Sequence, residues 1–265
     1  MLWKRVVSSL VLLPLVVAVV WFGDPWISIA VALFVLLGVL EFYRIAIITG
    51  WRPFVFLGTL LALLFVLNVH CDDERTTPLL ITAVIVLPLI RSLLYPVKRN
   101  AMMNWTWTIG GVFYLGWMMS HFILLRDMPE GRDWVFMVLF ATFACDTSAY
   151  FIGRAFGKNK MAPVVSPGKT WEGALGGLGG TVLAVVIIGL ITGLDEFGYL
   201  YIIPLGFLIG VFAQIGDLAE SAIKRSAETK EASSLIPGHG GMLDRLDSLI
   251  FTVILVYYWV LWVVQ

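Results

Sequence analysis

Long apolar runs recur along this 265-residue chain, separated by shorter polar connections. A hydrocarbon core about 30 Å thick is crossed by roughly 20 helical residues, and several runs approach that length. Because lipid offers backbone groups no hydrogen-bond partner, such runs must be helical. The pattern predicts an all-α, polytopic integral membrane protein of about nine transmembrane helices. The runs are Val6–Phe22, Trp26–Tyr43, Phe54–Val69, Pro78–Tyr95, Trp107–Leu125, Trp134–Ile152, Ala174–Thr192, Tyr199–Gly216 and Ser248–Val264.

Composition favours a membrane protein over a soluble one. Charged residues make up 14% of the chain, whereas soluble proteins average about 25%, so there is too little charge to coat a globule. The formal net charge is zero, which argues against nucleic acid as a partner. The two cysteines, Cys71 and Cys145, fall in distant segments, so no disulfide framework is expected.

The distribution of lysine and arginine predicts the orientation, because cytosolic loops of membrane proteins are enriched in both. With nine spans and a cytosolic N-terminus, only Arg75, Arg126 and Arg132 of the 18 Lys and Arg residues lie outside. The external loops are instead acidic. We therefore expect a cytosolic N-terminus and an external C-terminus, in a membrane of the bacterial inner-membrane type.

Two predicted cytosolic connections are long, Gly153–Gly173 and Asp217–Asp247, and both are rich in Gly, Lys and acidic residues. Long polar connections on one face of a compact protein usually carry function. We expect residues 1–132, with about five spans, to form an N-terminal membrane region. Residues 133–265, with about four spans and both long connections, are expected to form the catalytic membrane region.

Asp146 lies within the apolar run Trp134–Ile152. A carboxylate in a membrane span is costly, so it should face a partner or a water-filled cavity. An interhelical hydrogen bond would explain Asp146, but a functional site is the favoured interpretation. The pair Glu41 and Arg44, at the end of the earlier run Trp26–Tyr43, is instead interpreted as a feature of the membrane interface.

The first long connection contains a Ser-Pro-Gly-Lys-Thr turn, residues 166–170, that leads into a glycine-rich helix. A lysine at such a turn, here Lys169, can place an ammonium group on an anion near a helix N-terminus. The turn lacks the G-x-x-x-x-G-K-[ST] spacing of a phosphate loop, so as a nucleotide motif it is weak. Orientation in the membrane explains Arg154, Lys158 and Lys160, and close helix packing explains the glycines.

The second long connection carries the strongest signal. A helix that continues past the eighth run to Arg225 places Asp217, Glu220 or Ser221, and Lys224 on one face. Asp244 and Asp247, three residues apart, share a face at the start of the last helix, where the helix dipole tolerates negative charge.

Carboxylates from three helices would then meet at one depth and repel one another. A hard divalent cation such as Mg²⁺ is their natural counter-charge, and nearby basic residues predict that it arrives with phosphate groups. A solvated, salt-bridged loop is the alternative, but it explains poorly the glycines around His239. The predicted metal ligands are Asp217, Asp244, Asp247 and Asp146, and the basic residues are Lys169, Lys224 and Arg225.

Ordered motifs run through the second half of the chain: Ser221 to Arg225, then Lys230-Glu231, then I-P-G-H-G-G-M-L-D-R-L-D over residues 236–247. Their spacing closely resembles the signature of the phosphatidate cytidylyltransferase, or CDP-diacylglycerol synthase, family. The resemblance covers roughly residue 134 to the C-terminus. Two positions depart from the pattern: Glu231 stands where the family usually has Asp, and Gly168 where many relatives have Lys.

The resemblance implies that the chain transfers the cytidylyl group of CTP to phosphatidic acid, giving CDP-diacylglycerol and pyrophosphate. It implies Mg²⁺ as the cofactor, with a second cation as an option, and membrane lipid as the surroundings. Asp217, Asp244 and Asp247 would hold Mg²⁺, with Asp146 as a further ligand or the partner of one. The same three acids with Lys169, Lys224 and Arg225 would be catalytic, and the three basic residues with Gly238, His239, Gly240, Gly241 and Arg245 would bind substrate.

Other functional classes stay open on the sequence alone. A transporter tends to place charges near the bilayer midplane between related halves, whereas here they crowd one face. Another membrane phospho-transfer enzyme, such as a polyprenol-type kinase, is a second alternative. A CDP-alcohol phosphotransferase has a D-x3-D spacing that Asp244 and Asp247 do not follow. The sequence also leaves open whether the chain forms a homodimer.

Overall fold

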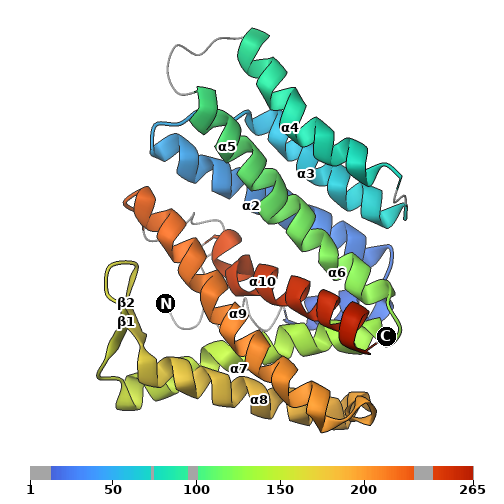
Figure 1. The fold of residues 1–265 in the computed structure, drawn as a ribbon, viewed down its shortest axis with the longest axis vertical. Coiled ribbons are helices and arrows are strands. Elements are labelled where there is room, and N and C mark those ends of the chain that lie inside the picture. The colour runs from blue at the N-terminus through green and yellow to red at the C-terminus, as the bar shows by residue number, and fades with distance from the viewer. Residues whose placement is uncertain (1–12, 73–74, 95–100, 230–240, 265) are drawn as a thin grey trace. The chain divides into compact units, whose positions relative to one another are not determined.

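The computed structural model describes residues 13–72, 75–94, 101–229 and 241–264 (Figure 1). Helices account for almost all of these residues. The elements are α2 (Trp26–Ile48), α3 (Val55–His70), α4 (Thr77–Leu94), α5 (Ala101–Gly111), η1 (Val112–Trp117), α6 (Met118–Asp127), α7 (Gly131–Phe156), β1 (Lys160–Ala162), β2 (Ser166–Thr170), α8 (Trp171–Thr192), η2 (Leu194–Phe197), α9 (Tyr199–Ser226), α10 (Leu243–Trp259) and η3 (Val260–Val264).

Seven of the described helical segments are long and apolar enough to cross a membrane. Two shorter apolar helices, Leu13–Phe22 and Val55–His70, accompany them. The predicted class, a helical membrane protein with several candidate spans, is therefore confirmed. The seven segments are Trp26–Ile48, Thr77–Leu94, Ala101–Asp127, Gly131–Phe156, Trp171–Thr192, Tyr199–Ser226 and Leu243–Val264.

The chain forms two compact units that do not follow a single cut in the sequence. The first lies within Met1–Leu124 and Ile223–Leu246, and the second within Leu125–Ala222 and Asp247–Gln265. The ends of α9 and α10 that carry Lys224 and Asp244 thus belong to the first unit, with the N-terminal helices. The predicted division at residues 132 and 133 stays a prediction.

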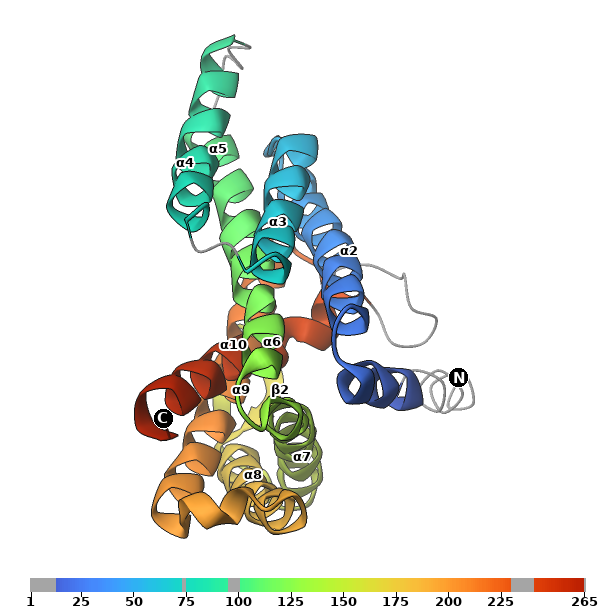
Figure 2. The ribbon, with the colours of Figure 1, turned by 90° about the vertical axis from the view of Figure 1, so that its right-hand side faces the viewer.

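In the first unit, α2, α3, α4 and α5 pack beside one another (Figure 2). Tyr43 of α2 lies at their centre and is fully buried. Its hydroxyl donates to the Thr108 carbonyl oxygen at 2.8 Å, and its ring lies over Gly58 and Gly111, where a Cβ would clash. A polar aromatic side chain therefore fills the space that two glycines leave between helices.

In the second unit, α7 and α8 pack along much of their length (Figure 1). The contact runs over glycines of α8: a Cβ at Gly176 would lie 2.5 Å from the Ile152 side chain, and one at Gly173 would lie 2.8 Å from the Ala149 carbonyl oxygen. The interpretation of these glycines as packing residues is confirmed there, whereas Gly179 faces open space.

Both long connections contain more regular structure than a loop. The stretch predicted as Gly153–Gly173 includes the end of α7 and an antiparallel hairpin of β1 and β2, with Lys160 opposite Thr170. The strands were not expected from the sequence. The predicted continuation of a helix to Arg225 is confirmed, since α9 ends at Ser226.

Candidate functional site

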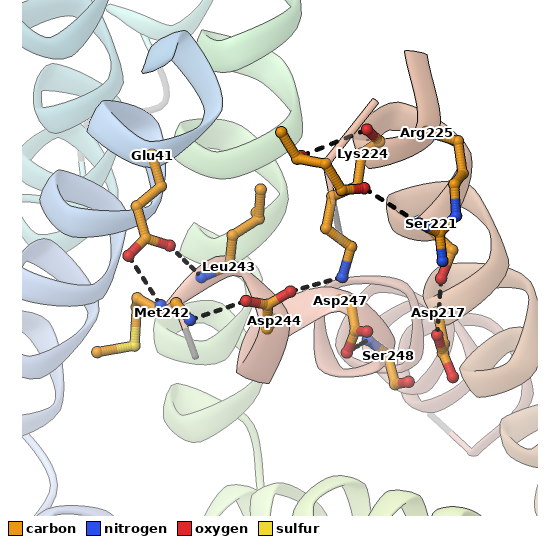
Figure 3. A network of polar contacts seen from close by, with 12 residues as sticks. Glu41, Asp217, Ser221, Lys224, Arg225, Met242, Leu243, Asp244, Asp247 and Ser248 are labelled. Carbon is orange, nitrogen blue, oxygen red and sulfur yellow. Dashed lines mark hydrogen bonds and ion pairs between the residues drawn. The ribbon is translucent and has the colours of Figure 1, made fainter. Parts of the chain in front are cut away.

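An ion pair joins the end of α9 to the start of α10 (Figure 3). Lys224 Nζ lies 2.5 Å from Asp244 Oδ1, and both side chains are only 12% exposed. The second carboxylate oxygen of Asp244 accepts a hydrogen bond from the Gly241 backbone N–H at 2.8 Å. Both oxygens of Asp244 are therefore oriented, one by a cation and one by the backbone.

Glu41 of α2 reaches the same helix start and is buried. Its two carboxylate oxygens accept hydrogen bonds from the backbone N–H groups of Met242, at 3.0 Å, and Leu243, at 2.8 Å (Figure 3). The first N–H groups of a helix lack partners within the helix, so a carboxylate there stabilises it by about 0.5–2 kcal/mol. The interpretation of Glu41 as interface decoration is wrong, because its side chain is buried against these donors.

A second ion pair lies in the second unit. Lys169 Nζ, from β2, is 2.8 Å from Asp217 Oδ2, from α9, and these side chains are 21% and 35% exposed. Ser221, one turn further along α9, donates to the other oxygen of Asp217 at 3.3 Å. The structure thus brings together two predicted site residues that are 48 positions apart in the sequence.

The hairpin and the start of α8 hold Lys169 in place. Thr170, the next residue, is the N-cap of α8, where its hydroxyl accepts the N–H three residues further on at 3.2 Å. The Glu172 carboxylate accepts the backbone N–H groups of Lys158 and Asn159, each at 3.2 Å, and ties the entry of the hairpin to the helix. Lys169 is therefore presented from an anchored strand end.

Acidic side chains gather around Asp247 in the same unit. Asp217 and Glu220 of α9 and Asp146 of α7 all lie within Coulombic range of Asp247. Glu220 is fully buried, and Asp247 Oδ1 accepts the Ser248 N–H at 2.6 Å. Carboxylates from three helices thus share one neighbourhood, and Lys169 offsets part of their charge through Asp217.

The donor set suits a hard cation, because carboxylate oxygens are the ligands that Mg²⁺ prefers. Within the parts of the chain that the structure describes, no three His, Cys, Asp or Glu side chains form a group that could hold one metal ion. Magnesium in nucleotide enzymes is usually bound through one or two carboxylates together with substrate phosphates.

The other predicted substrate-binding residues divide into two groups. Arg225 and Arg245 are exposed, and Arg225 donates to the Thr229 carbonyl oxygen at 3.3 Å. Gly241 is described and contributes its N–H to Asp244. Gly238, His239 and Gly240 lie outside the described residues.

Two buried acids, Glu41 and Glu220, were not among the predicted site residues. Glu41 lies within an apolar helical run, where a carboxylate indicates a functional site as it does for Asp146. Glu220 lies on the predicted helix face that carries Asp217 and Lys224, and this position is its signal in the sequence.

These features define a class: a polytopic helical membrane protein with two lysine–aspartate pairs, one between the end of α9 and the start of α10 and one between β2 and α9. The chain matches the Cytidylyltransferase family over residues 3–263 and belongs to that family. It is therefore an enzyme of the nucleotidyltransferase type.

Curated relatives are similar over nearly the whole chain. A phosphatidate cytidylyltransferase of Synechocystis sp. is 31% identical over an alignment 287 positions long, which covers 97% of this chain and 96% of the relative. The Pseudomonas aeruginosa phosphatidate cytidylyltransferase is 34% identical over 94% of this chain and 93% of its own length. The one from Bacillus subtilis is 36% identical over 146 residues, about half of each chain. The family resemblance in the sequence motifs is confirmed.

Proposed function

We propose that this chain transfers the cytidylyl group of CTP to phosphatidic acid, forming CDP-diacylglycerol and releasing pyrophosphate. The observation that carries this proposal is similarity along almost the full length to two phosphatidate cytidylyltransferases, together with membership of the family. Lys169 at the end of β2 and Lys224 at the end of α9 supply the positive charge that two phosphate-bearing substrates require.

The chemistry asks more for positioning than for a base. A phosphatidate oxygen, already an anion, attacks the α-phosphorus of CTP, and the bond to the β-phosphate oxygen breaks. No proton needs to be removed from the nucleophile. What lowers the barrier is alignment of the two substrates and neutralisation of their phosphate charge.

Lys169, Lys224 and Arg225 take the neutralising role in this proposal. Asp217 and Asp244 orient the two lysine ammonium groups. Each ammonium group has three N–H donors, so it can meet a phosphate oxygen while it stays beside its carboxylate. Substrate contacts by Arg245 and by Gly238, His239, Gly240 and Gly241 complete the predicted site.

The carboxylate oxygens of both acids keep lone pairs that a cation can use. We assign Mg²⁺ binding to Asp217, Asp244 and Asp247, with Asp146 as a further ligand or the partner of one, and a second cation stays an option. Bound Mg²⁺ would neutralise charge on the transferring phosphoryl group. This fits the chemistry of the donors and the usual sharing of Mg²⁺ with substrate phosphates.

The direct test is a radiolabelled CTP assay with phosphatidic acid in detergent, with and without Mg²⁺ and EDTA. We expect CDP-diacylglycerol to form with Mg²⁺ and to disappear with EDTA. Turnover that persists in EDTA would remove the cation from the proposal. No turnover in any condition, together with solute flux in proteoliposomes, would favour a transporter.

We further propose nine crossings, and the seven long candidate spans with two shorter apolar helices are compatible with that number. The distribution of Lys and Arg supports the proposed orientation, with a cytosolic N-terminus and a site facing the cytosol. In this topology the loop after α3 is external. Cys71 in that loop is exposed, whereas Cys145 is buried. A membrane-impermeant maleimide added to intact cells should label Cys71, and labelling only after permeabilisation would reverse the orientation.

A further inference from the structure

Glu41 is a carboxylate within a candidate membrane span, and its residue is only 6% exposed. A charge in such a place is costly unless polar groups meet it. The polar groups that meet Glu41 include the N–H groups of Met242 and Leu243, which follow it by 201 and 202 residues. The contact therefore ties the N-terminal helices to the start of α10.

The start of α10 is anchored at three successive residues. The N–H of Gly241 is taken by Asp244, and the N–H groups of Met242 and Leu243 are taken by Glu41 (Figure 3). All these residues, and Lys224, belong to the first compact unit. Glu41, which accepts from the start of α10, and Asp244, which pairs with Lys224, are thus linked through one turn of backbone.

We propose that Glu41 is a positioning residue for cytidylyl transfer: it fixes the start of α10 to α2 and so holds Asp244 against Lys224. The inference rests on the proposed function. Glu41 acts through the backbone of α10 and does not touch substrate. Reaction rates are sensitive to placement, since an error of about 1 Å can cost about 100-fold.

The experiment compares Glu41→Gln and Glu41→Ala with the wild-type enzyme in the CTP assay, with kcat expressed per folded molecule. The amide variant keeps one acceptor oxygen and loses the charge, so we expect kcat to fall about 10-fold. The alanine variant loses both acceptors, and we expect a fall of about 100-fold. The KM for CTP should stay within about twofold, because the residues that meet the triphosphate are unchanged.

Hydrogen exchange of the peptide over residues 241–246 reports directly on whether the start of α10 is anchored, which catalytic rates do not. The amides of Met242 and Leu243 should exchange faster in both variants than in the wild type. Asp24→Asn is the matched control, since Asp24 precedes α2 and accepts from Ser28 at 2.5 Å. Its kcat and its exchange over residues 241–246 should equal those of the wild type.

A Glu41→Gln enzyme with a kcat within twofold of the wild type would overturn the inference. A lower unfolding temperature with unchanged kcat per folded molecule would do so too, because it marks a purely structural role. If neither variant folds, the wild-type enzyme still tests the inference, because fast exchange of the Met242 and Leu243 amides in it would contradict the anchoring by Glu41. A wild type without CDP-diacylglycerol formation would instead defeat the proposed function, while the exchange data still test the anchor.

Discussion

The two lysine–aspartate pairs use the same side chains in different surroundings. Lys224 and Asp244 are each 12% exposed, and Asp244 is further held by backbone. Lys169 and Asp217 are 21% and 35% exposed, and the lysine comes from a strand end. Burial decides how much each pair contributes to stability: buried pairs are expensive to break, whereas exposed pairs contribute about 0–1 kcal/mol. The two pairs have similar proposed roles in binding phosphate, but breaking each pair should lower the free energy of unfolding by a different amount.

The largest effect is expected for Asp244→Asn. The change removes a proposed metal ligand and leaves the Lys224 ammonium group without its carboxylate in a buried place. We expect turnover to fall about 100- to 1000-fold and the free energy of unfolding to fall by about 3 kcal/mol. CDP-diacylglycerol formation and thermal unfolding of the purified variant measure both. Near-normal turnover would refute the role of Asp244.

The features that the sequence predicts well are local ones. Helical periodicity places Asp217 and Lys224 on the same continued helix, and acidic residues near a helix start place Asp244 and Asp247 in the first turns of α10. Each of these depends on residues within a few turns of one another. Small residues in apolar runs likewise predict close packing, because lipid supplies no hydrophobic force to hold helices together.

The features that it does not predict depend on distant partners. From the sequence alone Glu41 is interpreted as a membrane-interface residue, because the N–H groups that it accepts from lie 201 and 202 residues later in the chain. The hairpin was missed because Pro163, Pro167 and Gly168 favour turns, while the pairing of Lys160 with Thr170 closes around them. Proposed roles that need substrate, for Asp146 and Arg245 among others, stay predictions.

Asp217→Asn tests the exposed pair directly. We expect a loss of turnover of about 100-fold, since a proposed metal ligand is removed. Because the Asp217 side chain is 35% exposed, the free energy of unfolding should fall less than for Asp244→Asn, by about 1 kcal/mol. The same two measurements apply. A loss of stability as large as that of Asp244→Asn would erase the distinction between the pairs.

The matched control for Asp217→Asn is Asp133→Asn. Arg132 and Asp133 form an ion pair at 3.0 Å at the start of α7, and neither belongs to the predicted site. Turnover should stay within twofold of the wild type. A comparable loss there would show that the assay responds to any ion pair in the chain.

Thr170→Ala should have a smaller effect, through the support of Lys169. Loss of the N-cap hydroxyl of α8 costs about 1 kcal/mol of stability, and the strand end that presents Lys169 becomes less well fixed. We expect kcat/KM for CTP to fall about threefold to tenfold. Thr192→Ala is the control, since its hydroxyl bonds to the Ile188 carbonyl oxygen at the other end of α8. Equal losses in both variants would mean that the cap has no special relation to Lys169.

The smallest expected effect is a difference in the response to salt. At about 0.1 M salt the Debye length is about 10 Å and at 1 M it is about 3 Å, and screening acts mainly on charges that solvent reaches. The stability lost on changing Asp217 to Asn should therefore shrink as salt rises, whereas the loss on changing Asp244 to Asn should stay nearly constant, because the Asp217 side chain is 35% exposed and that of Asp244 is 12% exposed. Thermal unfolding of the two variants and the wild type across this range measures the difference. Parallel salt dependence for both aspartates would show that solvent reaches the two carboxylates equally, and the contrast drawn from their burial would then fail.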